Sequence, residues 1–158
     1  MKNRAPSPKS FRERSRRCCL ETLPVRVLVV EDFEPFRQLI SSMLGKRLEL
    51  QVISQVSDGQ DAVRQAEELK PDLILLDIGL PGLNGVEAAR RIRKLAPESK
   101  IIFVSQESSP YVVQVALSLG ALGYVLKSRV GSDLLPAVDA VRQGRQFVSS
   151  GLITIDPG

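Results

Sequence analysis

Acidic, hydroxyl and basic side chains follow four of the apolar stretches in this chain. Glu31 and Asp32 follow the first stretch, Asp77 the third, Ser105 the fourth and Lys127 the fifth. Three neighbouring carboxylates repel one another and keep raised pKa values unless a cation neutralises them. Mg²⁺ suits such a set, because it binds one or two carboxylates and completes its shell with water or phosphate oxygens. If these segments meet in space, their residue types predict a magnesium site.

The same side chains have the chemistry that phosphoryl transfer needs. A carboxylate such as that of Asp77 can act as the nucleophile and form an aspartyl-phosphate. Phosphoryl transfer spreads negative charge over three oxygens, so positive groups and hydrogen-bond donors must face them. Lys127 and Mg²⁺ would supply the positive charge, and the Ser105 hydroxyl could donate a hydrogen bond. We therefore interpret Asp77, Lys127 and Ser105 as candidates for this chemistry.

Apolar runs and amphipathic helical patterns alternate five times after Pro24. The runs cover residues 25–30, 51–56, 73–76, 101–104 and 124–126, and the helical patterns cover 36–45, 62–69, 86–95, 110–119 and 134–144. The third and fourth runs are continuously apolar, which is typical of parallel strands covered on both faces. Strict alternation with short connections predicts an α/β fold, the flavodoxin-like (βα)5 doubly wound parallel sheet with strand order 2-1-3-4-5. Ligands of such sheets bind at the carboxyl ends of the strands, where the polar residues stand.

Five segments, in this order, resemble the receiver domain of two-component response regulators. They read VLVVED (27–32), PDLILLD (71–77), LPGLNG (80–85), IIFVS (101–105) and GALGYVLK (120–127). Each segment alone is a moderate pattern, whereas all five at these spacings form a specific signature. The resemblance to this bacterial domain covers about residues 25–147 of the chain.

The resemblance implies a role for each matched acidic position. Asp77 would be the phosphoacceptor, and Asp32 would contact Mg²⁺ directly. Glu31 would act on the metal partly through water, and the backbone carbonyl of Gly79 would be a further ligand. Glu31 and Asp32 could also cap the following helix, because acids favour a helix N-terminus, and both roles can hold together.

The resemblance also implies a switch. Ser105 would be the switch hydroxyl, Lys127 the lysine beside the phosphoryl group, and Tyr124 the aromatic residue that changes rotamer when Ser105 moves. A tyrosine in a strand is also commonly a packing residue. Gln106 and Glu107 depart from the family pattern, which usually has a small residue after the switch hydroxyl. We expect these two residues to alter rates and not the class of reaction.

A receiver-like chain would be a regulatory phosphoacceptor that promotes only its own phosphorylation and dephosphorylation, and not an enzyme. Its expected partner is a sensor histidine kinase or a phosphotransfer protein, since the chain has no histidine, and a homodimer is a further expected assembly. One alternative is a phosphorylation-independent receiver-like binding module, which Gln106 and Glu107 favour. Another is the receiver part of a DNA-binding transcription regulator. A nucleotide-binding enzyme is disfavoured, because no Gly-rich phosphate loop comes after the first strand.

Charge and length divide the chain into three parts. Residues 1–23 form a basic leader, expected to be disordered, with seven basic residues against two acidic ones; the rest has fifteen against sixteen. Residues 24–147 form the receiver domain, and 148–158 form a tail. A domain-wide nucleic-acid footprint is therefore not indicated.

The segments GYVLKS (123–128) and GRQFVS (144–149) resemble NarL/FixJ-type regulators, in which a helix-turn-helix output domain follows the receiver. Only residues 150–158 remain here. We therefore expect either a stand-alone receiver or a fragment of a longer regulator, without DNA binding by this chain alone.

The remaining composition predicts a cytoplasmic location without membrane attachment. No apolar run approaches the ~20 residues that span a bilayer, and the N-terminus lacks the apolar stretch of a secretory signal. Cys18 and Cys19 are adjacent and are the only cysteines, which excludes a loop-closing disulfide framework and a zinc site.

Overall fold

The structure is a computed structural model that describes residues 23–152 of the chain. The predicted basic leader up to residue 22, including Cys18 and Cys19, lies outside the described residues, as do residues 153–158 of the predicted tail. Within residues 23–152, no helix is both long enough and apolar enough to cross a membrane.

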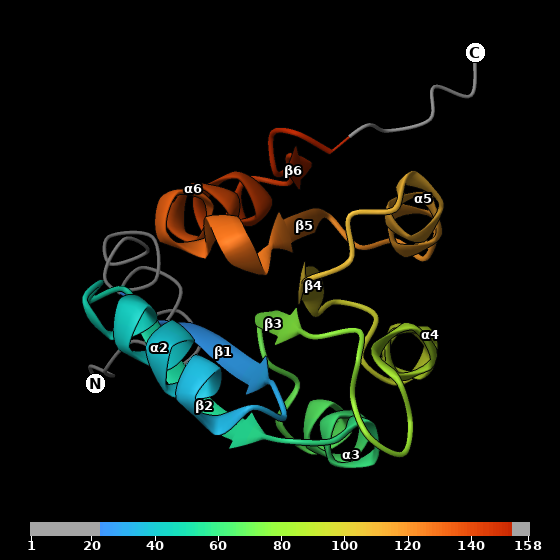
Figure 1. Ribbon diagram of the computed structural model, residues 1–158. Helices are drawn as coiled ribbons and strands as arrows, with labels where there is room; N and C mark the ends of the chain where they lie inside the picture. Colours follow the sequence, from blue (N-terminus) through green and yellow to red (C-terminus); the bar gives the residue numbers. More distant parts are fainter. Residues whose placement is uncertain (1–22, 153–158) are drawn as a thin grey trace, which may run out of the picture.

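A parallel sheet with helices on both faces forms the molecule (Figure 1). The strands are β1 (Val25–Val30), β2 (Leu50–Val56), β3 (Leu73–Leu76), β4 (Lys100–Ser105), β5 (Gly123–Leu126) and β6 (Phe147–Val148). The helices are α2 (Glu34–Gly45), α3 (Gly59–Leu69), α4 (Gly85–Leu95), α5 (Pro110–Ser118), the short 3₁₀ helix η1 (Lys127–Arg129) and α6 (Val130–Arg142).

The strand order is β2-β1-β3-β4-β5-β6, and all neighbouring strands are parallel. The predicted order of the first five strands is thus confirmed. The sequence did not predict β6, which pairs with β5 through Phe147 opposite Gly123 and Val148 opposite Tyr124. The packed structure extends beyond the predicted boundary at residue 147, because Ser149 is buried and Leu152 packs against the core.

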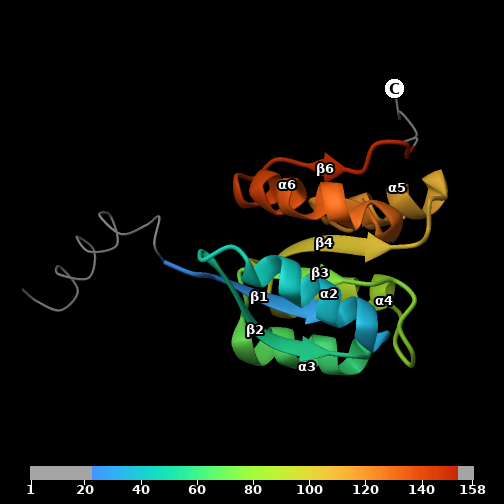
Figure 2. The same cartoon turned by 60° about the vertical axis from the view of Figure 1, so that its left-hand side comes forward.

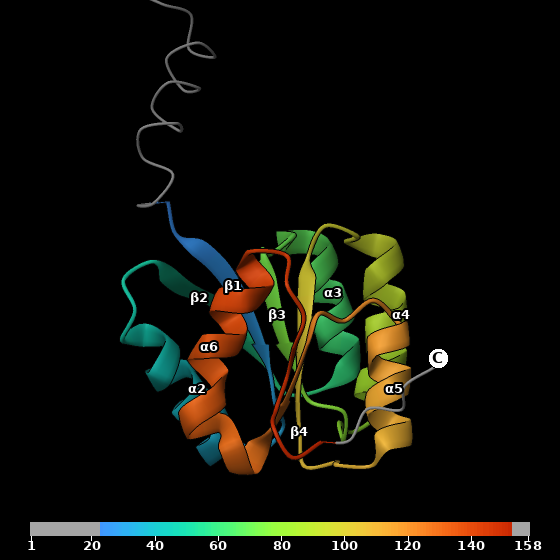
Figure 3. The same ribbon diagram turned by 90° about the horizontal axis from the view of Figure 1, so that it is seen from above.

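Two apolar layers hold the sheet between its helices. One contains Ala62 and Ala66 of α3, with residues of α4 and α5. The other contains Ile40 of α2 and Val138 of α6. Figure 3 shows α2 and α6 on one side of the sheet and α3, α4 and α5 on the other. Alternate residues of β1 and β3 enter the two layers, which explains why these strands are continuously apolar in the sequence.

Local capping chemistry sets where several helices begin. The side chain of Asp58 accepts a hydrogen bond from the Asp61 amide at the start of α3, at 2.8 Å. Asn84 caps α4 in the same way through the Glu87 amide, at 2.9 Å. Such side chains satisfy amides that have no partner inside the helix. These caps therefore fix the chain directly after β2 and directly before α4.

The last helix begins earlier than the sequence pattern indicated. The apolar periodicity predicted a start at residue 134, whereas α6 begins at Val130 and carries Pro136 in its interior. Proline lacks the amide that an inner helical turn uses and is common at helix starts. The first turn also contains Gly131 and Ser132, so the pattern before Pro136 reads as a loop.

Candidate functional site

Parallel pairing brings the ends of four strands to one edge of the sheet. Figure 2 shows the arrowheads of β1, β2 and β4 pointing toward the same side of the molecule. Glu31 directly follows β1, and Asp77 directly follows β3. The Asp77 amide donates to the Val30 carbonyl at 3.1 Å, so the β1–β3 pairing continues to the site. Ser105 ends β4, and Lys127 comes directly after β5.

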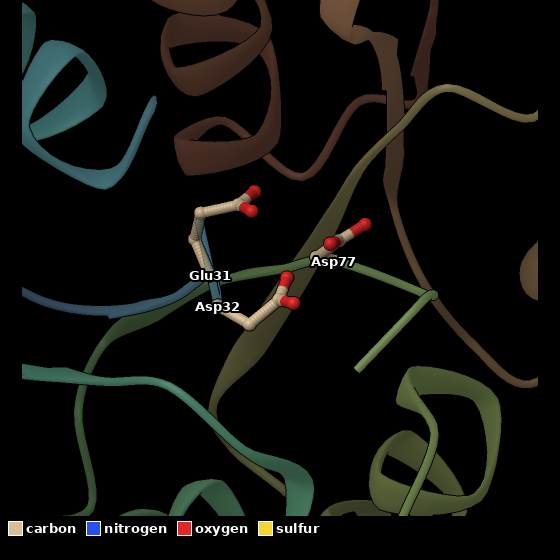
Figure 4. A group of neighbouring side chains, drawn as sticks. All are labelled: Glu31, Asp32 and Asp77. Carbon is tan, nitrogen blue, oxygen red and sulfur yellow. The ribbon is translucent and has the colours of Figure 1, made fainter. Parts of the chain in front are cut away.

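Three carboxylates converge at this edge. Glu31, Asp32 and Asp77 each offer an oxygen, and these oxygens lie within 4.8 Å of one another. Figure 4 shows the three side chains turned toward one region. Glu31 and Asp77 are buried, whereas Asp32 is exposed. The cluster therefore has one side open to solvent and two carboxylates that are held inside the protein.

Lys127 provides the positive charge of the cluster. Its Nζ lies 3.2 Å from Asp77 Oδ2 in a hydrogen bond. The same atom lies 2.8 Å from Glu31 Oε1 and forms an ion pair with it. Burial alone would lower the pKa of Lys127, but the attraction of Glu31 and Asp77 outweighs burial and raises that pKa. The ammonium group therefore stays protonated at neutral pH.

Glu31 is held from several directions. Its Oε2 accepts a hydrogen bond from the Phe33 amide at 3.0 Å, and its carbonyl accepts one from Arg37 at 2.8 Å. Burial raises the pKa of Glu31, and the contacts with Lys127 and with the Phe33 amide oppose that increase. The carboxylate is thus fixed in place, although one lysine only partly offsets the cost of burying it.

A cleft of about 560 Å³ opens over the cluster. The residues that line it are Glu31, Asp32, Phe33, Phe36, Asp77, Ile78, Gly79, Ser105, Gln106, Glu107 and Lys127. All of the predicted site residues except Tyr124 are in this set. Such a cleft has room for a phosphoryl group and a metal ion beside the carboxylates.

Ser105 and Tyr124 are connected through the backbone of Glu107. The Glu107 amide donates to Ser105 Oγ at 3.0 Å, and the Tyr124 hydroxyl donates to the Glu107 carbonyl at 2.7 Å. The Tyr124 ring is fully buried next to Phe103, and burial raises the pKa of its hydroxyl. Tyr124 therefore lies behind the cleft wall and packs in the core in this structure.

Gly79 lies in the loop that follows β3, and it lines the cleft beside Asp77. Its amide donates to Asp77 Oδ1 at 3.4 Å. The loop is closed by the Gly85 amide, which donates to the Ile78 carbonyl at 2.8 Å. Asp77 and Gly79 therefore belong to one short, hydrogen-bonded loop.

Sequence reasoning missed Phe36. Its ring lies 5.0 Å from Lys127 Nζ, a distance at which a cation is attracted to an aromatic face. In the sequence, Phe36 belongs to the apolar stripe of the first helix, which predicts only a core position. A phenylalanine one turn after Asp32 was the available signal, but its contact with Lys127 depends on the placement of η1.

Comparison with known proteins gives consistent results. The family described as "Response regulator receiver domain" matches residues 27–139. Response regulator GacA of Pseudomonas viridiflava is 35% identical over 126 residues, which are 79% of this chain and 58% of that protein. Transcriptional regulatory protein DegU of Brevibacillus brevis is 33% identical over 124 residues, which are 78% of this chain and 52% of that protein. The chain thus spans little more than half the length of these relatives.

Solved structures with the same architecture include two bacterial examples. A two-component response regulator of the LuxR family from Aurantimonas sp. SI85-9A1 matches with a TM-score of 0.78 and 29% identity, covering 82% of this chain and 92% of that chain. The response regulator domain of Thermotoga maritima CheB matches with a TM-score of 0.69 and 34% identity, covering 76% of this chain and 95% of that chain.

Proposed function

This chain belongs to the response regulator receiver domain family, and on that premise we propose that it is a phosphoryl-accepting signalling switch of a two-component system. Asp77 takes a phosphoryl group from a phosphohistidine with Mg²⁺ bound beside it. The observation that carries the proposal is the position of Asp77, clustered with Glu31 and Asp32 and bonded to Lys127 at 3.2 Å. The chain has no histidine, so the donor is a partner, a sensor histidine kinase or a phosphotransfer protein.

The acidic cluster fits a divalent cation. Its three carboxylates present oxygens within 4.8 Å of one another, and Lys127 is the single cation among the described residues that line the cleft. Hard cations bind oxygen ligands of this kind, and Mg²⁺ commonly keeps several waters. Glu31, Asp32, Asp77 and the Gly79 carbonyl would hold the ion. Bound there, Mg²⁺ would neutralise charge on the phosphoryl oxygens.

Asp77 supplies the nucleophile. One carboxylate oxygen attacks phosphorus, an O–P bond forms, and the P–N bond to the partner's histidine breaks. The electron pair of that bond stays on the ring nitrogen, and the imidazole leaves as a neutral group because its other ring nitrogen carries a proton. Lys127 already faces Asp77 Oδ2, and in the phosphorylated protein it would pair with a phosphoryl oxygen. The oxygen of Ser105 accepts from the Glu107 amide, which leaves the hydroxyl proton free to donate to another phosphoryl oxygen.

The Glu107 backbone would transmit the switch. A movement of Ser105 toward the phosphoryl group would strain the bond from the Glu107 amide to Ser105 Oγ. The Glu107 carbonyl accepts the Tyr124 hydroxyl, so a displacement of residue 107 would release or reorient Tyr124. A rotamer change of a buried tyrosine alters the packing of β5 and α5 and can be read by a partner.

Intact mass spectrometry tests the proposal. The protein is incubated with acetyl phosphate and Mg²⁺, and a mass gain of one phosphoryl group is expected. Asp77→Asn should gain nothing, because an amide is not a nucleophile for this step. Asp61→Asn, at a partly exposed acid on α3, is the matched control and should gain as the wild type does. An unmodified wild-type protein, or an equal gain in Asp77→Asn, would contradict the proposal.

A second candidate is a phosphorylation-independent receiver-like binding module. Gln106 and Glu107 line the cleft, where their bulk and charge oppose an incoming anion. Beryllofluoride, a mimic of the phosphoryl group, separates the two functions. A change in the amide NMR spectrum around Ser105 and Tyr124 supports the switch, and an unchanged spectrum supports the binding module.

The names of the relatives suggest a setting for the switch. DegU is described as a transcriptional regulatory protein, and this chain covers 52% of its length. We therefore infer that the chain is a receiver part of such a regulator. On this proposal it acts in the cytoplasm as a regulatory phosphoacceptor and not an enzyme, and pairs with a second copy. An open reading frame that continues in phase into a helix-turn-helix segment would establish the assignment.

A further inference from the structure

The first residue of α3 lies directly beneath the loop that joins β3 to α4. A Cβ placed on Gly59 would meet the Leu83 carbonyl oxygen at 1.8 Å and the Leu83 carbonyl carbon at 2.7 Å. Both distances are far below normal packing distances, and the atoms belong to backbone and not to a flexible side chain. The missing side chain of Gly59 is therefore what allows residue 83 to rest on α3.

The first turn of α3, on which residue 83 rests, is held in place by its own contacts. Gly59 is buried and follows Asp58, whose side chain caps α3 through the Asp61 amide at 2.8 Å. Ala62 and Ala66, further along the same helix, are fully buried in the core. Protein interiors are close-packed and yield little, so added volume at Gly59 must displace the loop and not the helix.

That loop begins with the candidate site residues. Asp77 and Gly79 stand at its start and line the cleft, whereas Gly59 does not line the cleft. The base of the loop is tight, because a Cβ on Gly85 would lie 2.0 Å from the Asp77 carbonyl oxygen. With the base closed in this way, a displacement at residue 83 passes along the few intervening residues toward Gly79.

We propose that Gly59 is a positioning residue for the metal site: it sets the resting position of the β3–α4 loop and thereby the placement of Gly79 and Asp77. Gly59 acts through the loop and touches neither the carboxylates nor the cleft. The inference rests on the proposed function only in that it takes the acidic cluster as a Mg²⁺ site. It assigns a functional consequence to a glycine whose sequence context indicates only a turn before a helix.

Magnesium affinity of Gly59→Ala is the decisive measurement. Mg²⁺ alone is titrated into the folded protein well below its unfolding temperature, and the Gly79 amide resonance is followed by NMR. We expect about tenfold weaker binding, the lower end of what displaced supporting groups cost a metal site. Gly45→Ala and Gly131→Ala are matched controls, because a Cβ at either position has nothing within 4 Å. Both controls should bind Mg²⁺ as the wild type does.

A third control separates positioning from stability. Ala66→Gly lies in the same helix but away from the loop, and it lowers the unfolding temperature without altering residue 83. If Ala66→Gly weakens Mg²⁺ binding as much as Gly59→Ala does, or if Gly59→Ala binds normally, the inference is overturned. A wild-type protein that does not bind Mg²⁺ overturns the proposed metal site itself, a result distinct from both.

Should Gly59→Ala fail to fold, Leu83→Gly tests the resting position of the loop from its other side. It keeps Gly59 and the Leu83 backbone but removes the Leu83 side chain. The Cβ of that side chain lies 2.9 Å from the position that a Cβ on Gly59 would take. The loosened loop should bind Mg²⁺ several-fold more weakly. An unchanged Mg²⁺ affinity in Leu83→Gly would count against a role of this loop contact in positioning the metal site.

Discussion

The two ends of the parallel sheet use their charges in opposite ways. At the amino end of the strands, charged side chains bond to backbone groups that close helices and loops, or pair with a charge of opposite sign, as Arg47 does with Glu49 and Asp139. At the carboxyl end, carboxylates face one another across a cleft with a single lysine among the described residues that line it. Both ends are rich in charge in the sequence, so the number of charges does not separate a structural end from a functional one. The two ends are distinguished by the groups with which each charge is paired.

Arg26 shows the amino-end arrangement. Its guanidinium donates to the carbonyls of Lys70 and Leu69 at 3.0 and 2.8 Å, which closes the C-terminus of α3. Lys70 in turn donates to the Leu95 carbonyl at the end of α4, at 2.5 Å. Asp72 accepts from the Arg26 amide at 2.8 Å. Since the last carbonyls of a helix have no partner within it, these contacts satisfy groups that would otherwise need water.

The largest difference between the two ends should appear when one lysine at each end is replaced by methionine. Lys127→Met removes the positive charge beside Asp77, and we expect the rate of mass gain from acetyl phosphate to fall about 100-fold. Lys100→Met, whose ammonium only donates to the Arg142 carbonyl at the amino end, should leave the rate unchanged. Equal losses in the two variants would remove the distinction between the ends.

Magnesium should stabilise only through the carboxyl end. At about 100 times its dissociation constant, Mg²⁺ should add about 2.7 kcal/mol to the free energy of unfolding. Asp32→Asn should lose most of this increment, because a carboxylate of the cluster is gone. Asp72→Asn changes an acid at the amino end and should keep the increment even if its own stability is lower. Thermal unfolding with and without MgCl₂ measures both.

Arg26→Met tests the amino end, where we expect a loss of stability without a loss of phosphoryl acceptance. The carbonyls of Leu69 and Lys70 lose their donor, so the free energy of unfolding should fall by about 1.5 kcal/mol. Phosphoryl acceptance, measured well below the unfolding temperature, should be normal. Urea unfolding gives the first quantity and intact mass the second. A slowed mass gain in a fully folded Arg26→Met protein would show that the two ends are coupled.

Asp133 sharpens the comparison. It is a buried acid near the carboxyl end, but both of its oxygens accept hydrogen bonds, from Ser132 and Arg129. Burial alone would raise its pKa, but hydrogen bonds from Ser132 and Arg129, together with the nearby Ser149 hydroxyl, outweigh burial and lower that pKa. The bonded carboxylate therefore contributes stability above its ordinary pKa of 3.8, and the contribution is lost as the pH falls through the lower folded value. Asp133→Asn should lose about 1 kcal/mol at neutral pH.

The pH dependence of unfolding checks this prediction. The difference between wild type and Asp133→Asn should shrink steadily in acid below the ordinary pKa of the carboxyl group. A difference that stays constant down to the acid limit would mean that Asp133 contributes through packing and not through its charge.

Most of the fold was predictable from the sequence, because strands buried on both faces are continuously apolar and helices repeat their apolar positions. β1, β3 and β4 fall within a residue of their predicted bounds. The convergence of Glu31, Asp77 and Lys127 was predictable for the same reason, since parallel strands deliver their carboxyl ends to one edge. The roles of these residues stay predictions.

Other features could not be predicted, since they depend on contacts without a period in the sequence. β6 is two residues long, which is too short for alternation to be recognised. The ring of Phe36 next to Lys127 and the backbone of Leu83 on Gly59 both join segments that are distant along the chain. A glycine that makes room for a passing backbone reads the same as a glycine in a turn.

The pairing of β6 with β5 limits how two copies of the chain can associate. Without β6, the strand that carries Tyr124 would expose a row of unpaired amides and carbonyls, a template for adding another strand. Here the Leu122 and Tyr124 carbonyls accept from Phe147 and Ser149, and the Leu126 amide donates to Ser149 Oγ at 3.0 Å. A neighbouring molecule therefore meets backbone along β5 that is already paired, and the sheet edge on this side is the two-residue strand β6, which is too short to template a long added strand.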